Sequence, residues 1–222
     1  MKYLNSVKIK KIGWTSFLIS SANVSAITDP LELSKIGTSF PKTSTDIALF
    51  TEYPKTIKTS ILKDTKLDAK VVPDKREKII EISTPGEFEV GGLMIRRDLD
   101  TDFYIIDENT VRVVYLGGTD STFNAENIKN IGDVDVLILP VGDGVNFMNF
   151  DVMEKVISEI DPAVILPCAF NEEGPSGNTL KTKEEFIKHF GFASVREESY
   201  LNVSKKKVDE EGAQSVEVIF LK

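Results

Sequence analysis

Histidine and cysteine are nearly missing from this chain of 222 residues, which contains one of each, His189 and Cys168. Histidine is the most frequent metal ligand and general base in proteins, and cysteine is the soft alternative. The chain therefore cannot assemble a zinc site from several histidines. A single cysteine also excludes an internal disulfide, so folding does not require an oxidising compartment.

Long apolar runs and a secretion signal are lacking too. No apolar stretch approaches the length that spans a bilayer, and the basic start MKYLNSVKIKKIGW has no apolar signal-peptide core. We therefore expect a cytoplasmic protein with no membrane partner. The chain has fewer basic than acidic residues, with 27 Lys and Arg against 35 Asp and Glu, which gives a net charge of −8. An acidic surface disfavours nucleic acid as a general partner.

The chain does contain enough apolar material for a sizeable core, with 41% hydrophobic residues and 13 phenylalanines. Composition of this kind excludes wholesale disorder. Neither a linker, nor a low-complexity segment, nor an internal repeat divides the sequence. We expect one compact domain over residues 1–222.

Short apolar and β-branched runs predict strands in the first half of the chain. Residues 17–20 and 24–28 are two such runs with a hairpin-like connection, and residues 46–50 form a compact third. Six more runs lie between residues 69 and 116, separated by short turns with proline, glycine or asparagine. Because a parallel crossover needs a dozen or more residues, this spacing predicts an antiparallel meander.

The second half alternates strands with helices, which predicts βαβ units and parallel pairing. The expected helices cover residues 124–130, 150–160 and 183–190, and the expected strands cover 135–140 and 163–167. Thr182 and Glu185 fit a capping box at the start of the last helix, and Gly191 fits its C-terminal cap. Residues 199–204 and 215–221 read as a final hairpin. The predicted fold class is α/β, with mixed sheets and outer helices.

Both rare residues have ordinary structural explanations. His189 lies at the C-terminal end of a predicted helix, where an imidazole interacts favourably with the helix dipole and the last carbonyls. Cys168 follows a strand and has no partner histidine nearby, so a buried thiol is the better interpretation than a reactive one. Trp14 precedes an apolar strand, and core packing is the better interpretation for it as well.

Carboxylates are the most plentiful candidates for acid–base chemistry or for an oxygen-only metal site. Spacing alone does not show that any two of them converge, and most acidic residues of an acidic protein are solvated. Asp29 and Asp151 have turn-like or cap-like settings, which lowers their weight. The candidates are Asp29, Glu52, Glu87, Asp120, Asp143 and Asp151.

Two glycine clusters, LGGTDS at 116–121 and PVGDG at 140–144, each follow a predicted strand. Neither has the spacing of a phosphate loop or of a dinucleotide-binding motif. Tight turns that need positive φ explain both. They still mark the carboxyl ends of strands, where open α/β sheets bind their ligands.

Six segments, in order and in approximate spacing, resemble the metallo-β-lactamase superfamily, and within it the small metal-dependent hydrolases that include ascorbate-6-phosphate lactonase. The resemblance covers nearly the whole chain and implies a four-layer αββα sandwich of two mixed sheets with outer helices. The segments are IGWTSFLISSANVSAITDP, TDIALFTEYPKT, STPGEFEVGGLMIR, VRVVYLGGTD, GDVDVLILPVGDG and DPAVILPCAF.

The resemblance implies a two-zinc site built from histidines and a bridging aspartate, but other residues stand at those positions here. Trp14 replaces the first histidine, Gly118 the bridging aspartate and Ala169 the last histidine. The motif that normally carries three histidines and an aspartate has Glu52, Pro54, Ile57 and Thr56 instead. Without these ligands the zinc-bound hydroxide is lost. We therefore expect no metal, no cofactor and none of the family's hydrolysis.

Two accounts of function follow. The first is a non-catalytic, metal-free homologue that acts as a binding module, scaffold or subunit, with a protein partner or through self-association. The second is a hydrolase-like enzyme with a zinc-independent site at the same sheet edge, acting on a small phosphorylated or lactone-like ligand. Its candidate residues are Glu52, Tyr53, Asp120, Asp143 and Cys168. A cleft in which two of these converge would favour the enzyme, whereas Trp14 and Phe170 filling that space would favour the homologue.

Nucleic-acid binding ranks third. Some members of the superfamily are nucleases, but the acidic balance and the missing ligands disfavour this role here. The run Lys205–Lys207 is too short to reverse the balance and reads as the exposed tip of the final hairpin.

Overall fold

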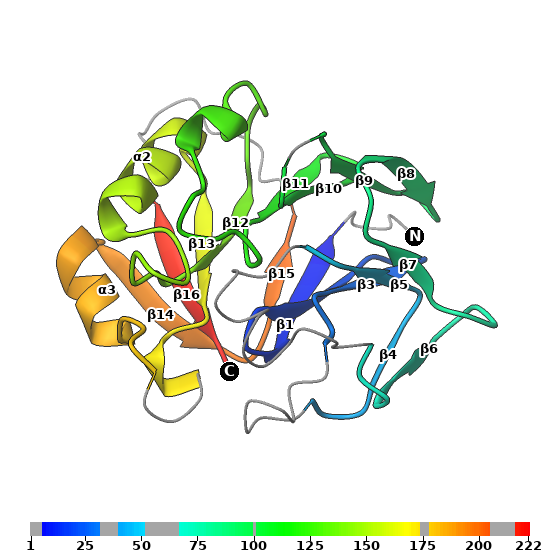
Figure 1. Cartoon of the computed structure of the whole chain (residues 1–222). Helices are drawn as coiled ribbons and strands as arrows, with labels where there is room; N and C mark the ends of the chain where they lie inside the picture. Colours follow the sequence, from blue (N-terminus) through cyan, green and yellow to red (C-terminus); the bar gives the residue numbers. More distant parts are fainter. Residues whose placement is uncertain (1–5, 32–39, 52–66, 100, 174–177, 205–215) are drawn as a thin grey trace.

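The structure is a computed structural model that describes residues 6–31, 40–51, 67–99, 101–173, 178–204 and 216–222. Within this part of the chain, no helix has both the length and the apolar composition that crossing a membrane requires. Two sheets lie face to face, and helices cover the outer face of the larger one (Figure 1). The run Lys205–Lys207 lies outside the described residues.

The smaller sheet has six strands in the order β15-β1-β2-β3-β5-β7. Its β1, β2 and β3 are antiparallel neighbours, whereas β3, β5 and β7 run parallel. The strands are β1 (Val7–Gly13), β2 (Ser16–Ser20), β3 (Ser25–Thr28), β5 (Ile47–Leu49), β7 (Ile80–Ile82) and β15 (Leu201–Val203). A separate parallel pair, β4 (Thr43–Thr45) and β6 (Val71–Pro73), lies beside it.

The larger sheet has eight strands in the order β14-β16-β13-β12-β11-β10-β9-β8. From β8 to β11 the pairing is antiparallel, and from β11 through β12, β13 and β16 to β14 it is parallel. The strands are β8 (Gly86–Val90), β9 (Leu93–Arg97), β10 (Tyr104–Glu108), β11 (Val111–Tyr115), β12 (Val136–Pro140), β13 (Val164–Cys168), β14 (Ser194–Glu198) and β16 (Glu217–Leu221).

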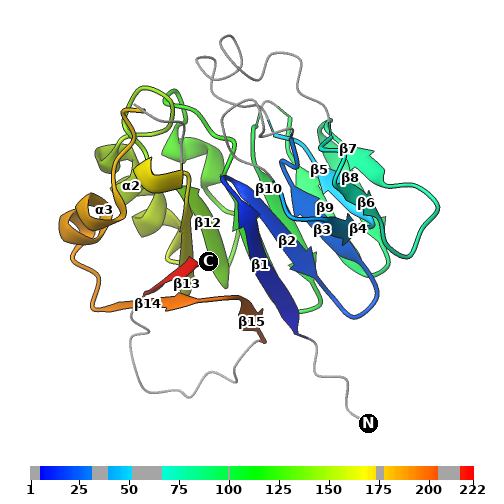
Figure 2. The same ribbon diagram turned by 90° about the horizontal axis from the view of Figure 1, so that it is seen from below.

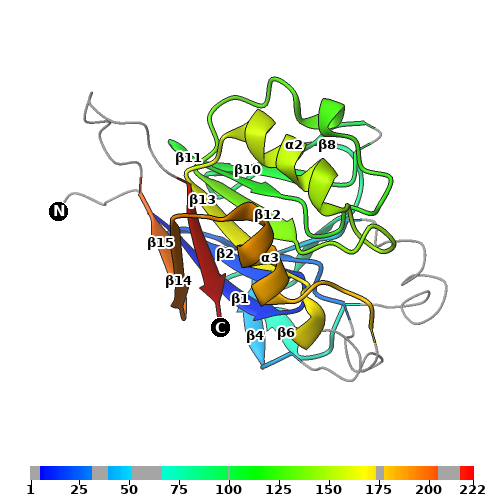
Figure 3. The same cartoon turned by 90° about the vertical axis from the view of Figure 1, so that its left-hand side faces the viewer.

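The helices follow the parallel strands of this larger sheet. Those that the structure describes are the 3-10 helices η3 (Ala125–Ile128) and η4 (Asn171–Glu173) and the α-helices α2 (Phe150–Ile160) and α3 (Lys183–Phe190). Seen from below, α2 and α3 lie on one side of the larger sheet and the smaller sheet lies on the other (Figure 2). The two α-helices run next to each other (Figure 3), and Phe150 of α2 contacts Phe186 of α3 edge to face.

Burial divides into layers that match this arrangement. The main core lies between the two sheets and includes Phe17, Ile47, Tyr104 and Tyr115. A second core lies under the helices, where Met153 and Val156 of α2 pack on the larger sheet. On the outer face of the smaller sheet, Ile27 and Ala48 pack with Val71 of β6. The predicted α/β sandwich of two mixed sheets is confirmed, while the single domain over residues 1–222 stays a prediction.

The last α-helix agrees with its sequence signals residue by residue. Thr182 accepts a hydrogen bond from the backbone N–H of Glu185, whose carboxylate accepts one from the N–H of Thr182. Gly191 ends the helix in the left-handed conformation, with φ of 60°. The predicted helix over 150–160 is also confirmed, with Asn149 as its N-cap. The helix expected over 124–130 is only the short 3-10 turn η3, capped by Asn124.

The predicted final hairpin is wrong. Strand β15 pairs with β1 in the smaller sheet, whereas β16 lies between β13 and β14 in the larger one. The chain therefore crosses from one sheet to the other between β14 and β15. The apolar runs were correctly identified as strands, but neighbours in the sequence are not neighbours in the sheets.

The antiparallel meander predicted over residues 69–116 is correct only for β8 to β11. Strands β6 and β7 pair in parallel with β4 and β5, which lie earlier in the chain. The residues between β5 and β6 supply the length that a parallel crossover needs.

Candidate functional site

The segments singled out by the sequence meet at one edge of the sandwich, where several parallel strands end. Asp29 follows β3, Thr51 follows β5 and the glycine pair at 117–118 follows β11. Ala169 follows β13, and Trp14 lies in the turn between β1 and β2. We call this the carboxyl edge. It is the place where α/β sheets bind ligands.

Asp29 is the centre of a buried hydrogen-bond network at this edge. Its side chain is fully buried and accepts bonds from the backbone N–H of Thr51 (2.7 Å), from Thr51 Oγ1 (2.5 Å) and from the Tyr115 hydroxyl (2.6 Å). The Tyr115 hydroxyl also lies 2.8 Å from the carbonyl oxygen of Thr15. Burial raises the pKa of Asp29, although these bonds oppose the rise. The network ties together the segments after β1, β3, β5 and β11.

The turn interpretation of Asp29 is thus correct in part. Its φ is 39°, which is a left-handed turn conformation. The side chain, however, is an internal acceptor rather than a solvated turn residue. Nothing in the sequence near Asp29 identifies Thr51 or Tyr115 as its partners, because they lie 22 and 86 residues away.

Trp14 is a core residue, as predicted. It is 3% exposed, and its ring lies 6.2 Å from that of Phe147 in a tilted arrangement. Its indole Nε1 is buried and has no hydrogen-bond partner among the described residues. Its φ is 49°, in the left-handed region that a bulky residue rarely adopts.

Ala169 has the same unusual backbone conformation, with φ of 51°, and is fully buried. Its backbone N–H donates to Glu173 Oε2 at 3.1 Å. The other carboxylate oxygen of Glu173 pairs with the ammonium group of Lys11 from β1. That ammonium lies 4.5 Å from the centre of the Phe170 ring. Burial raises the pKa of Glu173, and Lys11 opposes the rise.

Gly117 after β11 is explained by close contact rather than by positive φ. A Cβ on Gly117 would lie 2.4 Å from the Tyr115 hydroxyl, and neither Gly117 nor Gly118 has positive φ. In the second cluster, Gly144 does have φ of 77°. Gly142 would place a Cβ only 1.5 Å from the carbonyl oxygen of Met148. Gly117, Gly142 and Gly144 therefore have structural reasons, whereas nothing in the structure explains Gly118.

The described members of the enzyme candidate set are held in separate places, and of these Asp143 also accepts from the Thr179 hydroxyl at 3.1 Å. Asp120 caps its own turn by accepting from the N–H and hydroxyl of Thr122. Asp143 accepts from the N–H groups of Val145 and Asn146. Burial alone would raise the pKa of Asp143, but these and other hydrogen bonds outweigh it and lower the pKa. Cys168 is buried at the end of β13, and burial raises the pKa of its thiol far above the usual range.

The rest of the predicted site residues divide into two groups. Glu87 on β8 and Asp151 in the first turn of α2 are exposed, and His189 in the last turn of α3 lies 2.9 Å from Glu154 of α2 through Nε2. The other group lies outside the described residues and comprises Glu52, Tyr53, Pro54, Thr56 and Ile57.

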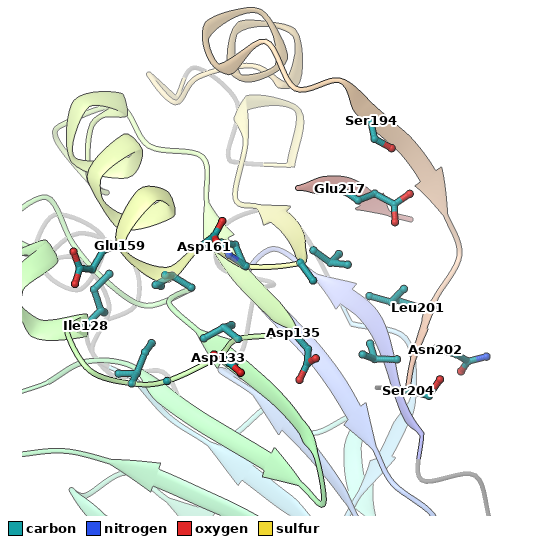
Figure 4. Close-up of a pocket in the computed structure, with 18 of the residues that line it drawn as sticks. Ile128, Asp133, Asp135, Glu159, Asp161, Ser194, Leu201, Asn202, Ser204 and Glu217 are labelled. Atoms are coloured by element: carbon teal, nitrogen blue, oxygen red, sulfur yellow. The ribbon is translucent and has the colours of Figure 1, made fainter. Parts of the chain in front are cut away.

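A cavity of about 920 Å³ lies away from the carboxyl edge, at the amino ends of β12 and β13 (Figure 4). Acidic side chains, including those of Asp133, Glu159 and Asp161, line it. Glu217 in its wall is paired with Arg196 at 2.7 Å. The cavity contains none of the sequence candidates, so we do not place the candidate site there.

At the described positions where the resemblance places metal ligands, the side chains have no donor group for a metal. Gly118 and Ala169 have no side-chain donor atoms, and the indole N–H of Trp14 only donates hydrogen bonds. In the described ranges, no three His, Cys, Asp or Glu side chains group as metal ligands would. Sequence reasoning missed Lys11 and Glu173. The signal for Lys11 was available, because it continues the buried positions Val7 and Ile9 of β1.

The sequence profile of the beta-lactamase superfamily domain matches residues 8–169. No curated protein sequence is similar enough to this chain to count as a match. Among solved structures, a protein from Thermotoga maritima that was proposed to be a Zn-dependent hydrolase of the metallo-β-lactamase superfamily aligns with a TM-score of 0.69. That alignment has 18% identity and covers 97% of this chain and 100% of that one.

Two further structures show the same fold at lower similarity. The metallo hydrolase Igni18 from Ignicoccus hospitalis has a TM-score of 0.58 and 16% identity, over 90% of this chain and all of its own. The diiron β-hydroxylase CmlA from Streptomyces venezuelae has a TM-score of 0.57 and 12% identity, over 90% of this chain and 54% of its own. Identities this low carry the fold alone.

Proposed function

Because this chain belongs to the metallo-β-lactamase superfamily, we propose that it is a metal-free member that acts as a non-catalytic binding, scaffold or subunit protein. The observation that carries the proposal is the chemistry of Trp14, Gly118 and Ala169 at the carboxyl edge. Zinc sites need neutral imidazole, thiolate or carboxylate donors, and none of these three residues supplies one. These three residues do not fit the metal that the family implies.

The backbone at two of these positions supports the same conclusion. Trp14 and Ala169 both have left-handed φ, at 49° and 51°. Asn, Asp and His adopt this conformation several times more often than other residues, whereas an aromatic or alanine residue gains nothing from it. We interpret these turns as ligand-bearing turns whose backbone shape persists although their side chains have changed.

Packing supports loss of an open site as well. Trp14 and Phe147 are both buried and their rings are in contact range. Phe170, the other residue expected to fill the space, is 9% exposed and lies under the Lys11 ammonium. Asp120, Asp143 and Cys168 lie in separate settings, and within the described residues no hydrogen bond joins any two of them, which favours the non-catalytic account.

Metal analysis of the purified full chain tests the proposal. Cells are grown with added zinc, manganese or iron, and the protein is isolated without chelators. We expect less than about 0.1 metal ion per chain, since the described part of the chain groups no set of ligands that would release protons and bind the ion. The Thermotoga maritima protein, isolated in the same way, is the positive control. Stoichiometric metal in this chain would overturn the proposal.

A thermal-unfolding scan with and without a chelator gives an independent readout. A bound ion stabilises the folded state by an amount that grows with its concentration relative to Kd. We therefore expect the same Tm with and without chelator. A lower Tm after chelation would contradict the proposal.

The scaffold role also predicts an assembly. Light scattering over a range of protein concentrations compares the particle mass with the 24.7 kDa of one chain. A multiple of that mass supports self-association as the role, and a single-chain mass at all concentrations overturns it.

A further inference from the structure

Lys11 occupies a strand position that the β1 pattern reserves for an apolar residue. Val7 and Ile9 are buried while Lys8 and Lys10 are exposed, so alternation directs position 11 inward. The Lys11 side chain is indeed only 5% exposed. A charged residue at an inward position breaks the binary pattern of the strand, and such breaks accompany special roles.

Two contacts hold this buried ammonium group, and a third fixes its partner. It forms an ion pair with Glu173 Oε1. It lies 4.5 Å from the centre of the Phe170 ring, in cation–π geometry. Glu173 is fixed in turn, because its Oε2 accepts the backbone N–H of Ala169 at 3.1 Å. The charge is therefore paired and its partner is oriented.

These contacts join the two halves of the sandwich. Lys11 belongs to β1 of the six-stranded sheet, whereas Phe170 and Glu173 lie just after β13 of the eight-stranded sheet. Lys11 and Glu173 are 162 residues apart in sequence. The connection lies beside Ala169, which the resemblance places at the last metal-binding histidine. Glu173 reaches the backbone of that residue directly.

We propose that Lys11, Glu173 and Phe170 form an internal clamp that holds the loop after β13 against β1. The clamp links the loops at the edge where a metal ion would otherwise link them. The clamp rests on the proposed function, because it replaces a tie that a metal-free chain lacks. A metal links its ligands from several loops with positive charge. In this chain the Lys11 ammonium supplies the positive charge, and the Glu173 carboxylate orders the loop after β13.

The physical basis is the cost of separating the pair. Removing one member leaves the other as an uncompensated charge in a mostly buried place, which is strongly destabilising. Replacing both by apolar residues of similar size is often neutral or better. The clamp therefore predicts strong coupling between the two positions, in contrast to an exposed ion pair.

A double-mutant cycle tests this with Lys11→Met, Glu173→Leu and the combined variant. We expect each single variant to lower Tm by roughly 5–15 °C and the combined variant to lie within about 4 °C of the unaltered chain. The exposed pair Lys183–Glu197 is the matched control, because it also joins a helix to a strand. Lys183→Met and Glu197→Leu are each expected to shift Tm by less than about 3 °C.

Hydrogen exchange locates the effect. In each single clamp variant, backbone amides of residues 168–173 should exchange at least about tenfold faster, while those of α3 stay unchanged. Strictly additive shifts in Tm, or single shifts no larger than those of the control pair, would overturn the clamp. Should a single variant fail to fold, recovery in the charge-reversed pair K11E/E173K or in K11M/E173L supports the clamp, and failure of both overturns it.

The two proposals fail in distinguishable ways. A chelator that lowers the Tm of the unaltered chain overturns the metal-free function, whatever the mutant cycle shows. Additive mutations in a chain that is insensitive to chelator overturn the clamp and leave the metal-free function in place.

Discussion

Replacing Tyr115 by phenylalanine removes one oxygen atom from the centre of the carboxyl edge. The hydroxyl lies 2.6 Å from Asp29 Oδ2 and 2.8 Å from the carbonyl oxygen of Thr15. A hydrogen bond to a charged group contributes about 1.5–3 kcal/mol, and a buried acceptor left without its donor adds to the loss. We expect Tyr115→Phe to cost about 2–3 kcal/mol, which lowers Tm by roughly 4–12 °C in a chain of this length.

Tyr104 provides the matched control for this variant. It is also fully buried. Its hydroxyl, however, donates to the backbone carbonyls of Phe50 (2.8 Å) and Ile82 (3.0 Å), whereas that of Tyr115 donates to a carboxylate. Tyr104→Phe should therefore cost only about 1 kcal/mol. Urea unfolding followed by tryptophan fluorescence measures both variants, since Trp14 is the single tryptophan and is buried at this edge. A loss in Tyr115→Phe no larger than that in Tyr104→Phe would refute the reasoning.

The pH dependence of the same variant has a definite sign. Burial raises the folded-state pKa of Asp29 above 3.8, so the folded chain gains stability as pH falls through that raised pKa. The Tyr115 hydroxyl favours the ionised form and opposes the rise. Without it the pKa of Asp29 is higher still, so Tyr115→Phe gains more on acidification. The stability difference between the two chains should narrow from neutral pH toward pH 4, and a constant or widening difference would contradict this assignment.

The remaining predictions concern backbone conformation and are read from urea midpoints. Gly117→Ala should cost about 1–3 kcal/mol, because its Cβ would lie 2.4 Å from the Tyr115 hydroxyl. Ala169→Gly, at φ 51°, should stabilise the fold by up to about 1 kcal/mol, and a loss would show that the methyl group has a packing role. Asp161→Gly should stabilise α2 by about 0.5–1 kcal/mol, since it relieves a φ of 46° and removes a carboxylate from the negative helix end. Thr182→Ala should cost about 1 kcal/mol by removing the cap of α3, and an unchanged midpoint would contradict that role.

Features encoded by neighbouring residues were predictable from the sequence. The cap of α3 is formed by Thr182 and Glu185, and its end is formed by Gly191, all within ten positions. The periodic helix over 150–160 and the hairpin of β2 and β3 are similarly local. In each case the residues that make the contact are also the residues that signal it.

Strand pairing was predictable only where partners are consecutive. Leu201 of β15 pairs with Ile9 of β1, at the opposite end of the chain. An apolar run shows that a strand will be buried, but the choice of partner depends on which sheet edge is free. The prediction of a final hairpin was wrong for this reason, and so was the prediction that β6 and β7 belong to the antiparallel meander.

In the candidate site, too, contacts between side chains that are far apart in the sequence could not be predicted. Its location was predictable, because the segments that end parallel strands must meet at the carboxyl edge. The Asp29 network was not, since its donors Thr51 and Tyr115 come from other strands. Lys11 was predictable in principle from the alternation of β1, although its partner Glu173 was not.

At this edge, the residues that stabilise the fold are not the residues at the metal-binding positions that the family implies. The fold can therefore persist when the residues at those positions change. Asp29, Thr51 and Tyr115 fix the loops through bonds that involve no metal-binding position. Trp14 and Ala169 can change without disturbing those bonds, provided that their turns keep the left-handed backbone. A chain built in this way retains a rigid edge after its ligands change. Under the proposed metal-free function, a partner is expected to bind on the surface of this scaffold rather than between Trp14 and Phe147, which are both buried.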